Sequence, residues 1–242
     1  MKKASFLNNE FASAFKDGYF ELAHKLVKAG ADMHNTIIEK DDGCFRVMEY
    51  AVENGLFEHI NALINMGYGI NDRDDNGRTA VFIAVKNEDY KVLTEVLKYK
   101  PDLNLRYKDM GGYYAAGRLF HKAENTTVLM QACYISGLRT IKKLLKRGVD
   151  ANAQDSCGFT PLMYLCVRYF KMPVTTEPQD GYGEIKCILS SGPEDDRLLD
   201  EDRLVVIAKV LLKAGADKNM VNKYGKTAWG MAISGMLKTT LK

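Results

Sequence analysis

The sequence predicts an all-α solenoid of stacked helix–turn–helix units joined by hairpin loops. A helix-end motif of two apolar residues, two variable residues and usually a glycine recurs at positions 30, 67, 100, 148 and 215. The gaps between these positions are 37, 33, 48 and 67 residues, which fit one period of 33 with insertions of 4, 15 and 34. A threonine stands 21 residues before each of the last three motifs, once the insertion of 34 is removed. A fixed period of this size is typical of proteins in which each unit packs on its neighbours.

The repeat makes residues 1–242 one domain of six units. Each unit is expected to contain a short first helix, a tight turn, a longer second helix and a loop. The units cover about residues 5–34, 35–71, 72–104, 105–152 with an insertion at 107–125, 153–219 with an insertion at 169–203, and a C-terminal cap at 220–242. We expect the cap to end before a full second helix.

Helix starts, helix ends and apolar stripes support this division. Threonines at positions 79, 127, 160 and 227 are good first-helix starts, because a hydroxyl can accept a hydrogen bond from a free backbone N–H. Glycines at 30, 67, 148 and 215 stand where a left-handed residue usually ends a helix. In the second helix of the fourth unit, Ile141 and Leu144 share one face while Lys142 and Lys146 lie on the other.

The two insertions differ in character. The first contains glycines and three tyrosines, so it is either an enlarged finger with exposed contact residues or a loop whose tyrosines pack back on the solenoid. The second has a local charge of −5 over residues 170–203. It is either a flexible, solvated loop or an acidic segment for docking or regulation.

The composition is that of a folded chain without a strong charge. Hydrophobic residues make up 46% of the chain and charged residues 27%, which argues against global disorder. The net charge of +3 gives no reason to expect nucleic acid or an anionic membrane as a partner. We therefore expect neither, and a chain that is monomeric on its own.

Cysteine usage and the N-terminus predict an intracellular protein. The five cysteines are widely spaced and form no Cys-x-x-Cys pair, as expected of free thiols in a reducing compartment. Polar residues directly follow the basic start at Lys2 and Lys3, so we expect no secretory signal. The longest apolar helix, over residues 204–212, is too short to span a membrane. We expect a cytoplasmic location, with secretion into a host cell as the alternative.

These motifs resemble the ankyrin repeat. Residues 155–162, Asp-Ser-Cys-Gly-Phe-Thr-Pro-Leu, and residues 74–79, Asp-Asp-Asn-Gly-Arg-Thr, match its opening, and residues 222–229 are a looser copy. The Gly-Ala-Asp helix ends and the closing asparagines Asn71, Asn104, Asn152 and Asn219 match its end. The resemblance covers nearly the whole chain. It implies an ankyrin solenoid that binds a partner protein on a concave face made of hairpin tips and first helices.

The chain departs from the family at several positions. The family's histidine, three residues after the threonine, is replaced in successive units by Glu49, Phe82, Met130, Met163 and Gly230. The usual threonine–histidine bond between units is therefore expected to be missing, and apolar packing should contribute more of the stability. Arg46 replaces the threonine of the second unit, and Lys100 replaces the glycine of the third.

The sequence contains no pattern that predicts catalysis or metal binding. The four histidines lack the spacing of metal ligands, and no phosphate-binding loop or nucleophile motif occurs. We expect no enzyme activity, no cofactor and no metal. An enzyme with a site built by the insertions is the alternative.

Carried over position by position, the resemblance predicts a non-catalytic protein–protein interaction module. The expected partner-binding residues are Asp75, Asn76, Arg78, Lys86, Asn87, Tyr134, Ile135, Phe159, Arg168, Tyr224 and Lys226. Of these, Arg78, Tyr134, Phe159 and Tyr224 are expected to be exposed anchors. The alternative is a pathogen effector that binds a host protein by the same face.

Overall fold

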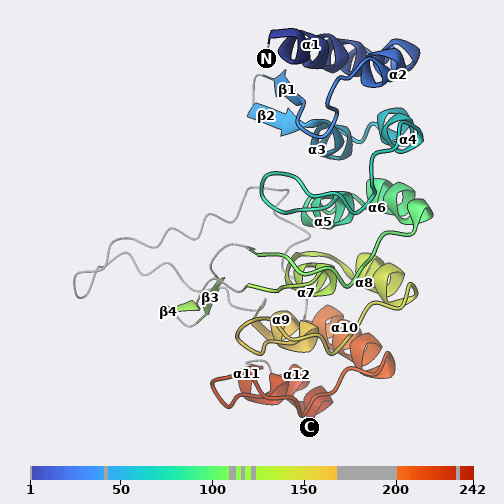
Figure 1. Cartoon of the computed structure of the whole chain (residues 1–242). Coiled ribbons are helices and arrows are strands. Elements are labelled where there is room, and N and C mark those ends of the chain that lie inside the picture. Colours follow the sequence, from blue (N-terminus) through green and yellow to red (C-terminus); the bar gives the residue numbers. More distant parts are fainter. Residues whose placement is uncertain are drawn as a thin grey trace, which may run out of the picture.

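The chain folds as one stack of helix pairs. The computed structural model describes residues 2–40, 43–108, 113–115, 118–120, 124–167, 201–232 and 235–242. In Figure 1 the first helix of each pair lies in one column and the second helix in the other, and the two termini lie at opposite ends of the stack. The predicted all-α solenoid of helix–turn–helix units is confirmed.

Six helix pairs lie within the described residues. They are α1 (Lys2–Lys16) with α2 (Phe20–Lys28), α3 (Val47–Glu53) with α4 (Phe57–Asn65), α5 (Ala80–Lys86) with α6 (Tyr90–Val96), α7 (Val128–Ile135) with α8 (Leu138–Leu145), α9 (Pro161–Val167) with α10 (Glu201–Lys213), and α11 (Ala228–Met231) with α12 (Gly235–Leu241). A short 3₁₀ helix, Leu97–Tyr99, directly follows α6.

The last pair corrects one expectation. The C-terminal cap was expected to end before a full second helix, but α12 forms and packs against α10 and α11. Leu237 and Leu241, four residues apart, share one face of α12 and are buried there at 0% and 2% exposure. The expectation was wrong because these two leucines are enough to anchor a short helix to the preceding unit.

The predicted threonines begin the first helices. The Thr79 hydroxyl accepts a hydrogen bond from the Phe82 N–H at 3.5 Å, and the Thr160 hydroxyl accepts one from the Met163 N–H at 3.3 Å. The hydroxyls of the threonines at 127 and 227 accept equivalent bonds at 3.4 and 3.2 Å. Each hydroxyl satisfies a backbone donor that the first turn leaves unpaired.

The predicted helix-ending glycines adopt left-handed backbone geometry. Their φ angles are 106° at Gly30, 99° at Gly67, 78° at Gly148 and 92° at Gly215. Lys100, which replaces the glycine of the third unit, takes the same region with a φ of 53° and a ψ of 54°. The backbone geometry of this position is therefore kept even where the residue type is not.

Apolar packing between first helices forms the centre of the core. Residues 80–85 of α5 are all buried, and α5 packs against α3 on one side and α7 on the other. The side chains that replace the family's histidine in units three to five, Phe82, Met130 and Met163, are 3%, 0% and 1% exposed. They bury apolar area between neighbouring units, where each exchange of water for a packed side chain stabilises the stack.

Asparagine side chains add a ladder of hydrogen bonds between successive units. The Oδ1 atom of Asn71 accepts a bond from the Asp102 N–H at 2.9 Å, and that of Asn104 accepts one from the Asp150 N–H at 2.9 Å. Asn152 repeats the contact with the N–H of Asp217 at 2.7 Å. The closing asparagine of each of these units is thus bonded to the aspartate of the next one.

Two small hairpins depart from an all-helical chain. Strand β1 (Ile37–Lys40) pairs antiparallel with β2 (Gly43–Arg46), and Ile37 lies opposite Arg46. This hairpin lies in the second unit, which holds the insertion of four residues. Strand β3 (Tyr113–Ala115) pairs with β4 (Arg118–Phe120) inside the first insertion. The sequence predicted an enlarged loop at the first insertion and four extra residues in the second unit, but not the strands at either place.

The base of the first insertion is closed by Tyr107. Its backbone exchanges two hydrogen bonds with Thr126, at 2.9 and 3.2 Å. Its ring packs on Phe82 with centroids 4.3 Å apart, and its hydroxyl lies 2.8 Å from the hydroxyl of Thr79. This tyrosine packs back on the solenoid, as one of the two predicted alternatives required.

Candidate partner-binding surface

The loop tips of three units are built by one side chain each. In the third unit the carboxylate of Asp74 accepts hydrogen bonds from the N–H groups of Asn76 and Arg78, at 2.9 and 2.7 Å. Asp155 does the same in the fifth unit and Asn222 in the sixth, each for the residues two and four positions on. The tips therefore present their side chains in a fixed conformation rather than as loose loops.

A second set of side-chain hydrogen bonds, which we call the tip ladder, joins the loop tips of neighbouring units. Arg73 donates to the carbonyl of Gly77 at 2.6 Å and to the carbonyl of Arg106 at 2.9 Å. Arg106 repeats this with the carbonyls of Asn125 and Gln154, at 3.1 and 2.8 Å. Gln154 continues with the carbonyls of Gly158 and Val221, at 2.9 and 3.2 Å. Each donor spans its own tip and reaches the equivalent residue of the next unit.

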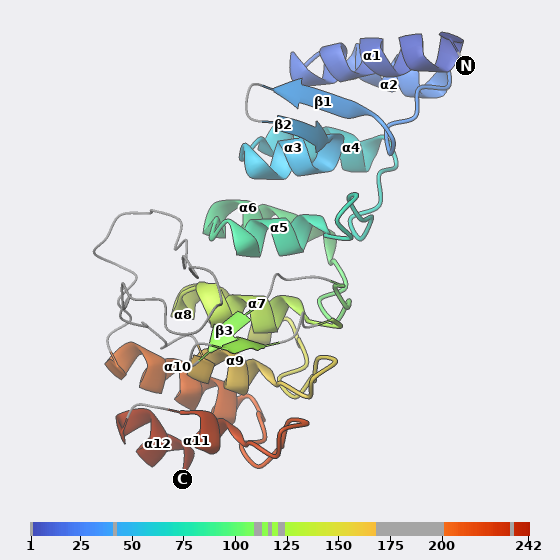
Figure 2. The same ribbon diagram turned by 90° about the vertical axis from the view of Figure 1, so that its left-hand side faces the viewer.

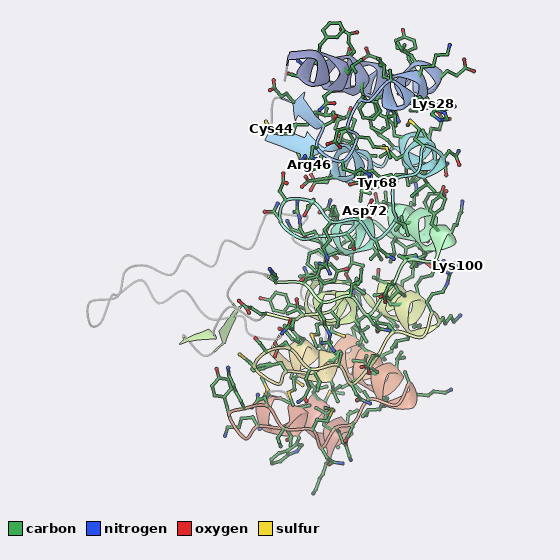
Figure 3. All side chains as sticks on the ribbon, viewed as in Figure 1. Lys28, Cys44, Arg46, Tyr68, Asp72 and Lys100 are labelled. Carbon is green, nitrogen blue, oxygen red and sulfur yellow. The ribbon has the colours of Figure 1, made fainter. Side chains whose placement is uncertain are left out.

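We call the surface formed by the loop tips and the first helices the hairpin face. It is the left-hand side of Figure 1 and is turned towards the viewer in Figure 2. Figure 3 shows Arg46 towards this side and Lys100 on the opposite side, at the end of the second helix of its pair. The hairpin face is the one that the sequence predicted as the partner-binding side.

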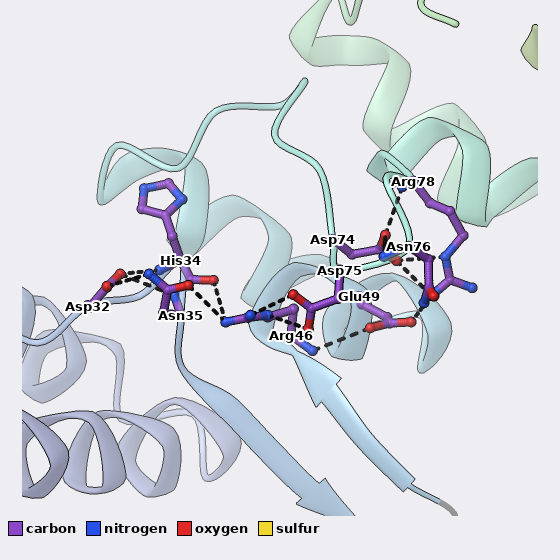
Figure 4. A network of polar contacts seen from close by, with 9 residues as sticks. All are labelled: Asp32, His34, Asn35, Arg46, Glu49, Asp74, Asp75, Asn76 and Arg78. Atoms are coloured by element: carbon purple, nitrogen blue, oxygen red, sulfur yellow. Dashed lines mark hydrogen bonds and ion pairs between the residues drawn. The ribbon is translucent and has the colours of Figure 1, made fainter. Parts of the chain in front are cut away.

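Ion pairs join the hairpin face of the second and third units. Arg46 bonds Asp75 with two parallel contacts, Nε to Oδ2 at 2.9 Å and Nη2 to Oδ1 at 2.6 Å. It also donates to the His34 carbonyl at 3.1 Å. Arg78 pairs with Asp74 at 2.6 Å and with Glu49. Figure 4 shows these residues as one continuous polar network, which lies where the threonine–histidine bonds were expected to be missing.

The pKa shifts in this network follow from pairing and burial. The hydrogen bond from Arg46 lowers the pKa of the exposed Asp75 carboxyl, and the same bond raises the pKa of Arg46. Burial raises the pKa of Glu49, and the attraction of Arg78 only partly opposes this. The Glu49 carboxylate is therefore the costly member of the network and Arg78 is the residue that makes its charge tolerable.

A cavity of about 1000 Å³ opens on the hairpin face between the third and fourth units. Its walls come from the third tip, from α5, from the two ends of the first insertion and from α7. The lining residues are Arg73, Asp74, Asp75, Asn76, Gly77, Arg78, Phe82, Lys86, Arg106, Lys108, Asn125 and Gln131. Five of these carry positive charge and two carry negative charge, so the wall has a net charge of +3.

The structure brings four of the sequence-predicted residues together in this cavity: Asp75, Asn76, Arg78 and Lys86. Asn76 and Lys86 are exposed. Arg78 corrects an expectation, because its side chain is only 12% exposed and is occupied by Asp74 and Glu49. It lines the cavity as a structural residue rather than as an exposed anchor. Asn87 is exposed beside Lys86 but does not line the cavity.

Two of the three predicted aromatic anchors, Phe159 and Tyr134, are less accessible than expected. Phe159 was expected to be exposed and is only 6% exposed, because its ring packs edge-on against Tyr164 and Tyr224. Tyr134 and Ile135 are half-buried, and Tyr134 packs against the core. Tyr224 is 43% exposed and Lys226 is exposed on the sixth tip, away from the cavity. Arg168 lies outside the described residues.

Among the residues that line the cavity, the prediction from sequence missed the cations Arg73, Arg106 and Lys108. Arg73 and Arg106 stand one period of 33 residues apart, and Gln154 follows at 33 plus the insertion of 15. A search for polar side chains that recur in register would have found this row. Lys108 and Asn125 could not be found in this way, because they stand at the two ends of the first insertion, and the glutamine at Gln131 of α7 does not recur in the other units.

The described residues offer no metal site and no membrane helix. Within them, no group of three or more histidine, cysteine, aspartate or glutamate side chains is placed to hold a metal ion. None of the helices in that part of the chain combines the length and the apolar character that crossing a bilayer requires. The thiol of Cys166 is buried, which raises its pKa to about 12 and leaves it protonated at neutral pH.

Comparison with known proteins agrees with the geometry. Residues 11–107 match the family model for ankyrin repeats in three copies. The nuclear factor NF-kappa-B p105 subunit of Gallus gallus is 22% identical over 205 residues, which are 84% of this chain and 20% of that protein. The protein YahD of Escherichia coli (strain K12), named as an ankyrin repeat protein, is 26% identical over 176 residues, 72% of this chain and 65% of its own length.

Proposed function

Because residues 11–107 match the family model for ankyrin repeats and paired helices continue through the described chain to residue 241, we propose that this protein is a non-catalytic module that binds a partner protein on its hairpin face. Ankyrin repeats are generally protein–protein interaction modules. The chain spans 20% of the chicken relative and 65% of the bacterial one, so the partners of those proteins are not carried over.

The cavity between the third and fourth units is the observation that supports this proposal most strongly. It is the place where exposed polar side chains, a fixed loop tip and a concave wall occur together. The surrounding ion pairs and the ladder from Arg73 hold the wall rigid before any partner arrives. A prearranged surface loses less conformational entropy on binding than a loose one, which favours recognition at this face.

Capture of the partner tests the proposal. The full chain and its variants serve as bait in extracts of the cells in which the protein occurs, and captured proteins are quantified by mass spectrometry. The double variant Asn76→Arg/Lys86→Glu changes two exposed residues of the cavity wall. We expect recovery of the main partner to fall about tenfold, since rim charges and contacts at this scale are worth about 1–2 kcal/mol.

The matched control lies on the opposite side of the stack. Lys142 and Lys146 of the fourth unit's second-helix region are exposed and are not part of the cavity. The variant Lys142→Glu/Lys146→Glu changes the net charge by more, −4 against −1, and should nevertheless leave recovery unchanged. Equal losses in both variants, or no loss in either, would remove the hairpin face as the binding surface.

A further inference from the structure

We propose that the cavity between the third and fourth units binds an acidic peptide segment, whose carboxylates lie against the cationic wall and whose backbone N–H bonds Gln131. This inference rests on the proposed function and names the chemistry of the partner at that face. Three features of the cavity carry it: fixed positive charges, carboxylates that are already paired, and one buried acceptor without a donor.

Two of the three arginines of the wall form no ion pair with a carboxylate of the described residues. Arg73 and Arg106 are held by backbone carbonyls, with bonds of 2.6 to 3.1 Å to the four acceptors of the tip ladder. A carbonyl fixes the direction of a guanidinium without cancelling its positive charge. Each guanidinium has five N–H donors, so the ladder bonds leave donors for a ligand. Two parallel hydrogen bonds from one guanidinium to one carboxylate are among the stronger contacts in proteins.

The two carboxylates of the wall are already engaged. Asp75 receives both parallel bonds of Arg46, and Asp74 is bonded by Arg78 and by two backbone N–H groups. Lys86 and Lys108 are exposed and form no ion pair with the carboxylates of the described residues. Arg78 is used internally, but the positive charges of Arg73, Arg106, Lys86 and Lys108 are available to an incoming anion.

Gln131 supplies the feature that points to a peptide. Its side chain lines the cavity although the residue is only 7% exposed, and its Oε1 atom accepts no hydrogen bond from the described part of the chain. A buried acceptor without a donor costs about 1–3 kcal/mol. A ligand that brings an N–H next to its negative charge would relieve this cost, and an acidic peptide has one at every residue.

The shape of the charged surface favours a peptide over nucleic acid. The cations line one cavity of about 1000 Å³, a size that holds several side chains. Nucleic acid is bound along extended basic tracks that follow many phosphates. The lining here includes the apolar ring of Phe82, and the whole chain carries a net charge of only +3.

Fluorescence anisotropy of the full chain tests the inference. The probe is a fluorescein-labelled peptide of alternating glutamate and serine, and the reference probe has every glutamate replaced by glutamine. We expect saturable binding of the acidic peptide, at least tenfold tighter than the glutamine peptide and weaker at high salt. Lys86→Glu/Lys108→Glu should weaken it about tenfold or more, whereas Lys142→Glu/Lys146→Glu should not.

Gln131→Leu separates recognition from stability. The substitution removes the unpaired acceptor and keeps the volume, so the melting temperature should stay the same or rise. Affinity for the acidic peptide should nevertheless fall several-fold. A loss of affinity that appears only together with unfolding would overturn the role given to Gln131.

The remaining outcomes decide between the inference and the broader proposal. Equal binding of the acidic and glutamine peptides would sink the inference, and so would tighter binding of an oligothymidylate of equal charge. If neither probe binds while Asn76→Arg/Lys86→Glu still abolishes partner capture, the inference fails and the proposed function stands. If the acidic peptide binds and partner capture does not depend on the hairpin face, the proposed function fails instead.

Discussion

At the scale of single residues, backbone geometry follows the repeat even where the residue type has changed. Lys100 adopts the left-handed conformation that glycine takes at the other helix ends. An L-residue in this region costs about 1–2 kcal/mol relative to the right-handed one. The third unit therefore carries a small, local strain that its sequence could relieve by one substitution.

Lys100→Gly should raise the free energy of unfolding by about 1 kcal/mol, because glycine takes this conformation without the penalty. Urea denaturation followed by circular dichroism measures the effect. Two controls should go the other way: Lys98→Gly loosens the 3₁₀ helix, and Gly148→Ala forces alanine into a φ of 78° where nothing else lies within 4 Å of the new methyl group. A lower midpoint for Lys100→Gly would contradict the assignment of strain.

Tyr68 should make the free energy of unfolding fall as the pH rises above 10. Burial first, and the nearby Asp72 second, raise the pKa of its hydroxyl from 10.0 to about 12. The unfolded phenol loses its proton above pH 10 while the folded one keeps it, so the stabilisation is complete below pH 10 and is lost as the pH rises to 12. Tyr68→Phe removes this dependence. Between pH 8 and pH 11 we expect the variant to lose about 1 kcal/mol less than the unchanged chain.

Urea unfolding at the two pH values measures that difference. Tyr19→Phe is the matched control, because the ring of Tyr19 is 64% exposed. It should lose stability between the two pH values as the unchanged chain does. Identical pH profiles for Tyr68→Phe and Tyr19→Phe would rule out a contribution from the buried hydroxyl.

At the scale of elements, polar side chains and apolar packing share the task of joining units. Phe82, Met130 and Met163 join units by burial. Glu49 joins them by charge, through Arg78 of the next tip. The second unit combines an arginine at the helix start with an added hairpin. Its ion pairs reach the third unit, and a hydrogen bond from Arg46 reaches the His34 carbonyl of the first unit (Figure 4).

Substitution of Arg78 should destabilise the fold more than substitution of its partner Glu49. Arg78→Met leaves the carboxylates of Glu49 and Asp74 without their cation in a half-buried place, and we expect a loss of about 2–3 kcal/mol. Glu49→Gln also removes the carboxylate whose pKa burial raises, so it should cost less than about 1 kcal/mol. Urea denaturation of both variants and of the double variant gives their coupling energy. Equal single losses with no coupling would contradict the network.

The sequence determined the elements that obey the period and missed those that do not. The threonine starts, the glycine ends and the buried face of Ile141 and Leu144 could be predicted because each has a local physical reason that recurs. The β1–β2 hairpin could not, since four extra residues carry no periodic signal. The prediction that Phe159 is exposed at its tip was also wrong. Its ring is covered by Tyr164 and Tyr224, and these contacts depend on how two units pack together.

The candidate site could be predicted only in part for the same reason. The third tip and Lys86 follow from the repeat, and the structure places them in the cavity. The opposite wall comes from Arg106, Lys108 and Asn125, which the first insertion separates in sequence and the Tyr107–Thr126 bridge brings together. A single period cannot foresee contacts made across an insertion.

At the scale of the whole molecule, each unit depends on its immediate neighbours. The first helices form an unbroken series of contacts from α3 through α5 and α7 to α9 and α11. The asparagine ladder runs from Asn71 to Asp217. In the second unit Gly69 takes the place of the aspartate, and its N–H is bonded instead by Asp72 of the same loop, at 2.8 Å. The first two units therefore lack one of the ties found further along.

This arrangement predicts a gradient of local stability. Hydrogen exchange followed by mass spectrometry should show the slowest amides in α5 and α7, which are covered on both sides. Exchange should be faster in α1, α2, α11 and α12, where the end units have a neighbour on one side. Asn104→Ala should speed exchange in the units on both sides of its bond to Asp150 more than in the second unit. Uniform exchange along the chain would contradict a stack held by nearest neighbours.

The tip ladder has a consequence for how such chains change length. Arg73 spans its tip by bonding a carbonyl four residues on, whereas Arg106 makes the same bond to a carbonyl 19 residues on. The same kind of bond thus closes a short turn in the third unit and a long insertion in the fourth. The helix pairs of both units stack in the same way. The fold already accommodates an insertion between Lys108 and Asn125. A foreign sequence grafted there, such as a tag, a sensor or a new recognition loop, should therefore leave the stack of helix pairs intact.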